Sequence, residues 1–348
     1  MKILAIGDPH FKVDNAEESE HFHRQLERWL SEHDPLDFIV ILGDILHSHE
    51  KIYTYAMNTA VKFIKMCSTY APVWCLVGNH DATSNTIYCG SNHWLHVLDG
   101  ASERIHIVEK PVWVTPHIVA CPYVSDGRFI EMCNEFLGDG KVQDASLIFA
   151  HQLFNGGKMG AIVASNVEEW PEEWPMIVSG HLHDRQQPQP NLYYTGSSQQ
   201  TAFSESGDKS LCLLSVDDTG EGEVKLDEIF LELKQRKTLY ASLKELEDIV
   251  DKIKEFITYK IVVKDSDDAI KAYKKTAKYK ELIKHPQIRS VQFKPMKEET
   301  PDEPAREVSD FLMQLQARLS GENPYLQSYA SHMLTNAEDL SNKDIVLI

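Results

Sequence analysis

The sequence lacks long apolar runs and paired cysteines. No apolar stretch reaches the roughly 18 residues that a membrane-spanning helix needs, so we expect no membrane span. The six cysteines form no CxxC pair, and several lie in apolar runs that are typical of buried free thiols, which predicts a reducing, cytoplasmic compartment. The opening MKILAIGDPH has one basic residue, a short apolar stretch and no small-residue cleavage site, so we expect no secretion signal.

Basic residues are also scarce, except in one segment. The chain has 35 Lys and Arg against 53 Asp and Glu, a net charge of −18 that by itself disfavours a nucleic-acid ligand. Residues 234–297, however, contain 17 basic and 9 acidic residues, so this segment carries +8 and the rest carries −26. An acidic body with one basic segment favours a nucleic-acid contact, although a solvated Lys-rich helix produces the same pattern.

Short apolar runs recur through residues 1–233, and each is bounded by polar residues, Gly or Pro. Runs of four to six such residues predict buried strands. They are Ile3–Ile6, Phe38–Leu42, Val73–Val77, Ile118–Cys121, Leu147–Ala150, Met176–Val178, Leu192–Tyr194 and Leu211–Val216. Amphipathic stretches at 18–31 and 53–69 separate the first three, and this alternation predicts parallel βαβ units in a layered α/β sandwich.

The pattern changes after residue 234. Residues 239–256 predict a helix, 259–263 a strand, 265–284 a Lys-rich helix capped by Asp265 or Ser266, and 288–293 a second strand. We therefore expect a small α/β domain over 234–297. Residues 298–348 begin with a Pro-rich acidic linker and continue with two expected helices, at 305–319 and 325–335.

Five polar segments each follow a predicted strand. They are Gly7-Asp8-Pro9-His10, Gly43-Asp44-Ile45-Leu46-His47, Gly78-Asn79-His80-Asp81, Ala150-His151 and Gly180-His181-Leu182-His183. Because loops at the carboxyl ends of parallel strands meet at one edge of a sheet, these segments are expected to converge. Imidazoles and carboxylates suit Mn, Fe or Zn, and a pair of such ions activates water against phosphoesters. Each segment alone occurs often by chance, but all five in this order predict a two-metal hydrolase.

The order DxH, GDxxH, GNHD, H, GHxH resembles the calcineurin-like metallophosphoesterase superfamily over residues 1–233. The resemblance implies a four-layer αββα sandwich and two divalent ions, with Mn²⁺ favoured over Mg²⁺, Fe or Zn. It implies that His80 faces the substrate phosphate and acts as a general acid. The implied ligands are Asp8, His10, Asp44 and His183 for one ion, and Asp44, Asn79, His151 and His181 for the other.

Two further features resemble the double-strand-break repair nuclease branch, which contains the nuclease subunit of the bacterial SbcC–SbcD complex and the T-even phage recombination nuclease. One is His47 in GDxxH, which by resemblance positions the phosphate backbone. The other is Tyr194-Thr195-Gly196-Ser197 followed by Ala202-Phe203-Ser204-Glu205, although a strand that ends in a Gly-Ser turn also explains the first part. The Arg and Glu that mark protein phosphatases of the superfamily are missing.

This branch implies a metal-dependent DNA exonuclease or endonuclease of recombination and repair. It also implies an SMC-like ATPase partner bound by the C-terminal helices, which could instead dock on the chain's own body, and a homodimer. Lysines at helical spacing are expected to contact DNA phosphates: Lys271, Lys274, Lys275 and Lys278. The alternatives are a small-molecule or nucleotide phosphodiesterase or phosphatase of the same superfamily, and a non-catalytic scaffold, which the full set of ligand positions disfavours. Of the remaining histidines, only His49 lies near these segments.

Overall fold

The computed structural model describes residues 1–296 except 87, 161, 218, 221, 247, 248 and 250–252. The strands are β1 (Lys2–Ile6), β2 (Phe38–Ile41), β3 (Val73–Leu76), β4 (Ile105–Val108), β5 (Val112–Thr115), β6 (Ile118–Ala120), β7 (Leu147–Ala150), β8 (Lys158–Met159), β9 (Ile162–Val163), β10 (Met176–Ser179), β11 (Gln186–Gln189), β12 (Leu192–Tyr194), β13 (Leu211–Ser215), β14 (Lys225–Ile229), β15 (Gln235–Ala241), β16 (Ile257–Asp265) and β17 (Ile288–Pro295). The helices are α1 (Ala16–Glu32), α2 (Thr54–Tyr70), α3 (Phe129–Leu137), α5 (Asp267–Tyr273) and α6 (Ala277–Leu282), with 3-10 turns η1 (Val13–Asn15), η2 (Trp94–Leu98) and η3 (Lys141–Asp144). The two helices predicted beyond residue 297 lie outside the described residues. Within the described part, no helix combines the length and apolar character needed to cross a membrane.

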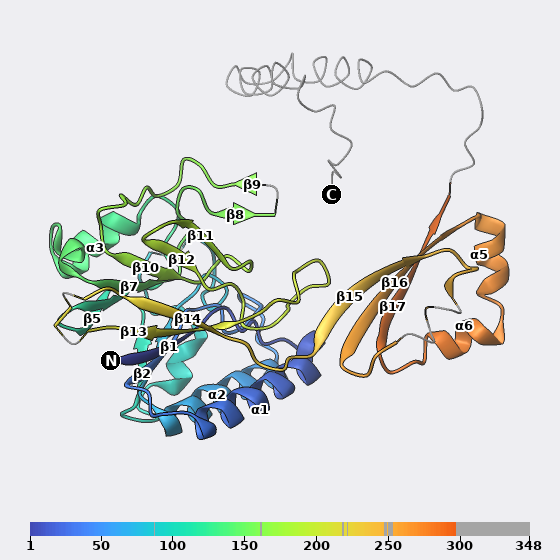
Figure 1. Cartoon of the computed structure of the whole chain (residues 1–348), viewed down its shortest axis with the longest axis horizontal. Helices are drawn as coiled ribbons and strands as arrows, with labels where there is room; N and C mark the ends of the chain where they lie inside the picture. The colour runs from blue at the N-terminus through green and yellow to red at the C-terminus, as the bar shows by residue number, and fades with distance from the viewer. Residues whose placement is uncertain are drawn as a thin grey trace, which may run out of the picture. The chain divides into compact units, whose positions relative to one another are not determined.

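Two six-stranded sheets form the body of the chain (Figure 1). The first has the order β14-β13-β1-β2-β3-β4, with β1 to β4 parallel, and the second has the order β11-β12-β10-β7-β6-β5, with β12, β10, β7 and β6 parallel. All eight predicted apolar runs are strands of these sheets, and both predicted amphipathic helices are present as α1 and α2. The predicted α/β sandwich is therefore confirmed.

The alternation of side chains along the strands produces the layers. Along β1, Ile3 and Ala5 point between the two sheets and pack in one cluster with Phe149 of β7. The intervening Leu4 and Ile6 face the other side and pack against α1 and α2. The outer face of the second sheet packs against α3, through a cluster that includes Val119, Ile148, Phe129 and Met132. The architecture is thus αββα, with parallel strands buried on both faces.

A separate three-stranded sheet follows, in the order β15-β16-β17. The predicted helix over 239–256 begins too early, because Gln235–Ala241 pairs in parallel register with β16. Further along the same stretch, Leu246 and Ile249 are helical, as predicted. The prediction of one helix over 265–284 is wrong. Ser266 caps α5, as expected, but Thr276 caps a second helix by accepting a hydrogen bond from the Tyr279 amide, so the chain turns between α5 and α6.

Helices cover one face of this third sheet, and the other, called the open face, borders a cleft in which Tyr240 is exposed and Val262 is buried. Alternate strand residues, including Tyr259, Ile261 and Val263, pack in one cluster with Tyr273 of α5 and Leu282 of α6. The residues between them point the opposite way and line this cleft: Thr238, Tyr240, Lys260, Val262, Gln292 and Lys294.

The buried side chain of Arg236 joins β15 to the start of α1. Its guanidinium donates to Glu18 Oε1 at 3.1 Å and to the Asp14 carbonyl oxygen at 3.0 Å. Residues 1–294 form one compact unit by their contacts, and the domain boundary proposed at 233/234 stays a prediction.

Candidate metal centre

The predicted metal ligands all lie at the carboxyl ends of parallel strands. Asp8 and His10 follow β1, Asp44 follows β2 and Asn79 follows β3 in the first sheet, while His151 follows β7 and the pair His181 and His183 follows β10 in the second. Since the two sheets pack face to face, their strand ends meet at one edge, and the five motif loops converge there.

The backbone at this edge adopts conformations that are rare for residues with side chains. Asp8, His10, Asp44 and His181 have positive φ angles of 33°, 45°, 47° and 78°. Each such residue costs on the order of 1–3 kcal/mol, and such positions cluster at functional sites. A Cβ on Gly78 would lie 2.2 Å from the Asp44 nitrogen, so only glycine lets the β2 and β3 loops touch.

The donor atoms form two groups that share Asp44. In the first, His10 Nε2 lies 2.8 Å from His183 Nε2 and 3.5 Å from Asp44 Oδ2. In the second, His151 Nε2 lies 3.0 Å from Asn79 Oδ1 and 3.4 Å from Asp44 Oδ1. His181 Nδ1 joins this group at 3.1 Å from the same Asn79 oxygen. Donors that bind one ion at about 2.0–2.2 Å lie roughly 3–3.5 Å apart, so each group fits one divalent ion.

In His151 and His183, the ring nitrogen that faces away from the cluster is hydrogen-bonded. His151 Nδ1 donates to the Leu42 carbonyl oxygen at 2.6 Å, and His183 Nδ1 donates to Glu205 Oε1 at 2.9 Å. In each ring Nε2 therefore faces the cluster, and once it has lost its proton this is the tautomer that a metal-binding histidine needs.

Burial and charge also prepare the site for a cation. Burial and the neighbouring Asp44 raise the pKa of Asp8 to about 7. Burial opposes ionisation of Asp44 too, but His151 and His10 outweigh it and hold the pKa of Asp44 well below its usual range. Burial lowers the pKa of His181 to about 3, so its imidazole is neutral near pH 7. The Oδ2 atom of Asp8 is buried and has no hydrogen-bond partner among the described residues, as expected of an oxygen placed to bind a metal.

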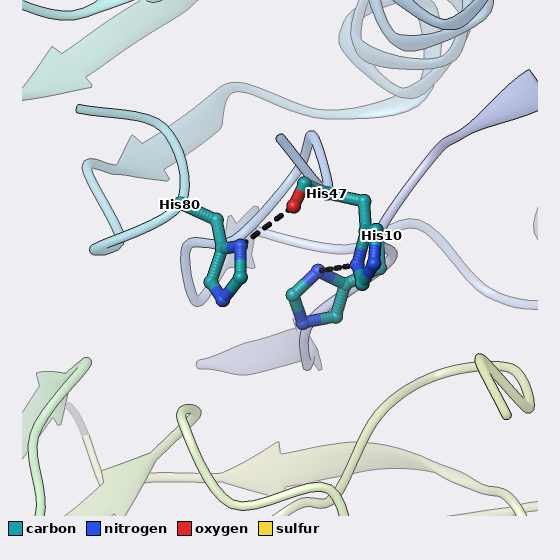
Figure 2. A group of neighbouring side chains, drawn as sticks. All are labelled: His10, His47 and His80. Carbon is teal, nitrogen blue, oxygen red and sulfur yellow. Dashed lines mark hydrogen bonds between the residues drawn. The ribbon is translucent and has the colours of Figure 1, made fainter. Parts of the chain in front are cut away.

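His80 and His47 lie beside the first group of donors (Figure 2). His80 Nδ1 donates to the His47 carbonyl oxygen at 2.7 Å, and His80 Nε2 lies 3.9 Å from Asp44 Oδ2. His47 Nδ1 is 3.4 Å from His10 Nδ1. Both rings are half-buried, and burial lowers the pKa of His47 to about 4.

The structure thus brings together all seven predicted ligands, His80 and His47. It does not bring Lys271, Lys274, Lys275 and Lys278 to this cluster, since they lie on α5, on α6 and in the turn between them.

Two residues without a predicted role also shape the site. The Asp81 carboxylate accepts hydrogen bonds from the Ile45, Leu46 and Gly78 amides and from Trp94 Nε1, and so ties the β2 and β3 loops together. The sequence feature that could have identified Asp81 is its place in the GNHD segment. The Tyr123 ring stacks on His181 at 5.7 Å, and no pattern in the sequence marks it.

Glu205 is expected to support metal binding through His183. Its carboxylate also contacts Lys209 Nζ at 3.1 Å and accepts from the Thr201 amide at 2.9 Å. We expect Glu205→Gln to weaken Mn²⁺ affinity about 10-fold, because the amide orients the imidazole less strongly than the carboxylate does. Titration calorimetry on the metal-free protein measures this. Glu131→Gln, at an exposed Arg128 ion pair, is the matched control, and equal affinities in both variants would contradict the role.

Comparisons with known proteins identify the family of the chain. The family model described as Calcineurin-like phosphoesterase matches residues 1–185. The chain is 36% identical over 303 residues to "Putative phosphoesterase 078R" of Invertebrate iridescent virus 3, covering 86% of each protein. It is 37% identical over 269 residues to "Putative phosphoesterase 244L" of Invertebrate iridescent virus 6, covering 76% of this chain and 94% of the relative.

Two solved structures are similar at low scores. Nuclease MPE of Pseudomonas putida matches with a TM-score of 0.31 and 17% identity, covering 61% of this chain and 83% of that one. Hypothetical protein PH1004 of Pyrococcus horikoshii matches with a TM-score of 0.34 and 11% identity, covering 73% and 94%. Because the family model spans more than half of the chain and both viral relatives align over most of their length, the chain belongs to the calcineurin-like phosphoesterase family.

Proposed function

We propose that this phosphoesterase is a DNA nuclease of the double-strand-break repair branch, which hydrolyses phosphodiesters with two divalent ions, Mn²⁺ favoured. One ion would be held by Asp8, His10, Asp44 and His183, and the other by Asp44, Asn79, His151 and His181. Bound ions supply positive charge to the phosphoryl oxygens and lower the pKa of a water nucleophile. His80 Nε2 faces the same space and is placed to protonate the leaving oxygen, while His47 holds the His80 ring through its carbonyl oxygen.

The open face of the three-stranded sheet is the observation that favours DNA. Together with Phe203 and Ser204 it lines a cleft of about 540 Å³. Lys260 and Lys294 supply positive charge, and the Tyr240 ring is 68% exposed. Lysines bind backbone phosphates without reading sequence, and exposed aromatic rings stack on bases. A small ester would not need such a surface.

This cleft lies next to the metal centre along the chain and in space. Phe203 and Ser204 belong to the loop that carries Glu205, and Glu205 contacts the metal-ligand candidate His183. Ser204 also lines a second pocket that contains His183 itself. A strand bound on the open sheet face could therefore continue to the ions.

The lysines predicted from helical spacing are placed differently. Figure 1 shows α5 and α6 along one side of the sheet, and their apolar residues pack on its covered face. Lys271 forms an ion pair with Asp267, and Lys274 Nζ lies 4.7 Å from the centre of the Phe293 ring. We therefore propose Lys260 and Lys294 as phosphate contacts ahead of the helix lysines. An SMC-like ATPase bound by residues 298–348 belongs to the proposal, although that segment lies outside the described residues.

The proposal predicts metal-dependent DNA degradation. The purified full chain is incubated with linear duplex and single-stranded DNA, with Mn²⁺ or Mg²⁺, beside bis(4-nitrophenyl) phosphate. We expect both DNA and the chromogenic ester to be hydrolysed with metal and neither with excess EDTA, because the convergent donors act only through bound cations. Turnover of the ester with intact DNA would instead assign a small-molecule phosphodiesterase.

A further inference from the structure

Another pocket is lined by residues that contact His80 and Asn79. It has a volume of about 620 Å³, within the usual range for ligand pockets. Its lining comes from the segments after β2 and β3: Ser48, His49, Glu50, Lys51, Tyr53, Thr83, Ser84 and Asn85. Two of these residues contact the centre. The His49 ring stacks on His80 with centroids 4.4 Å apart, and Asn85 Oδ1 accepts from Asn79 Nδ2 at 3.5 Å.

His49 constrains the orientation of the His80 ring. The two rings are inclined by only 22°, and the His47 ring is also nearly parallel to His80, at 14° and 5.6 Å. The hydrogen bond from His80 Nδ1 to the His47 carbonyl fixes one edge of the ring, but it leaves rotation about that bond. Stacking by His49 opposes this rotation. The His49 Nδ1 atom is buried without a hydrogen-bond partner among the described residues, so the ring acts through its shape.

The chemistry of hydrolysis favours a leaving group on the His80 side. A P–O bond to a water oxygen forms as that water loses a proton to solvent, and the P–O bond to the leaving oxygen breaks. The leaving oxygen would take the Nε2 proton of doubly protonated His80, whose Nδ1 donates to the His47 carbonyl oxygen, and solvent would then reprotonate the ring. The leaving group must therefore lie beside His80, next to the pocket that His49 lines. We propose that this pocket binds a nucleoside leaving group and that His49 is a positioning residue for His80; this inference rests on the proposed nuclease function.

The pocket lining fits a nucleoside. Ser48, Thr83 and Ser84 offer hydroxyl groups and Asn85 offers an amide, which are suitable hydrogen-bonding partners for a sugar. The Tyr53 ring is 54% exposed and can stack on a base. The charges of Glu50 and Lys51 balance, so the pocket suits a neutral group.

The role of His49 is tested by varying the leaving group. Bis(4-nitrophenyl) phosphate releases a stable anion that needs no proton, whereas diphenyl phosphate releases a stronger base that does. We expect His49→Ala to lower kcat about 10-fold or more for diphenyl phosphate and less than about 3-fold for the nitrophenyl ester, since general acids contribute typically 10²–10⁴-fold. His49→Phe, which keeps a stacking ring, is expected to restore most of the phenyl-ester rate.

Equal losses on both esters, or no rescue by phenylalanine, would show that His49 has only a structural role. This comparison needs no DNA, so it decides the role of His49 even where the nuclease proposal fails. The nucleoside pocket is tested with a short single-stranded oligonucleotide: Tyr53→Ala is expected to raise the KM for this oligonucleotide about 5-fold or more, because the stacking ring is lost. If the wild-type protein cleaves the oligonucleotide and the variant has the same KM, the pocket does not bind the nucleoside. If the wild-type protein does not cleave the oligonucleotide, both the nuclease function and the assignment of a nucleoside to this pocket are wrong.

Discussion

Replacing Asp44 with asparagine is expected to lower the phosphodiester turnover number by at least about 10³-fold. The carboxylate places one oxygen 3.5 Å from His10 and the other 3.4 Å from His151, so its two oxygens reach a histidine of each donor group. Asparagine has the same shape but lacks the charge, and its NH₂ group cannot bind a cation. One substitution therefore weakens both ion sites, and the stabilisation of the transition state is lost with them.

The measurement is kcat on bis(4-nitrophenyl) phosphate with saturating Mn²⁺, together with metal content and circular dichroism. Asp34→Asn is the matched control, because the Asp34 side chain is 80% exposed and pairs with Lys2. Lys2 lies at the amino end of β1, whereas the metal centre lies at the carboxyl ends of the strands. We expect the Asp44 variant to stay folded, since asparagine still accepts a hydrogen bond from the His80 amide. A folded variant that retains its metal and more than a tenth of its activity would overturn the assignment of the centre.

The sequence predicted the sandwich well because its strands are buried on both faces. Ile3, Leu4, Ala5 and Ile6 alternate between two cores, so every position is apolar and the run stands out. Strand β15 has no such signal. Its residues Lys237, Thr238 and Tyr240 are not buried, and the helical spacing of the residues that follow extends back to Leu239, so only pairing with β16 reveals the strand.

The site could be predicted for a related reason. The ligands sit immediately after those apolar strands, so chain order alone places His10, Asp44 and His181 at one edge. Residues that act across space carry no comparable signal. The stacking of Tyr123 on His181, and of His49 on His80, depends on how separate loops pack. For the same reason the sequence does not choose between the helix lysines and Lys260 and Lys294, because composition reports a basic segment but not which face of its sheet is covered.

Reversing two charges on the open sheet face is expected to weaken DNA binding strongly. In Lys260→Glu/Lys294→Glu, two phosphate contacts would become two repulsions, and we expect the affinity for single-stranded DNA at low salt to fall about 100-fold. The slope of log affinity against log salt should fall by about 2, because each phosphate contact contributes roughly one released counterion. Fluorescence anisotropy with a labelled oligonucleotide, with EDTA present to prevent cleavage, measures both quantities.

The chain offers its own control for this change. Lys274→Glu/Lys275→Glu alters the net charge by the same amount in the turn between α5 and α6, so general repulsion affects both variants equally. A loss confined to the Lys260/Lys294 variant, with turnover of bis(4-nitrophenyl) phosphate unchanged in both, would place the DNA on the open face. A loss of affinity confined to the Lys274/Lys275 variant would instead show that the helix lysines contact the DNA phosphates, as the sequence analysis predicts. Equal, small losses would mean that neither face binds DNA, and the metal centre would then act on smaller phosphodiesters.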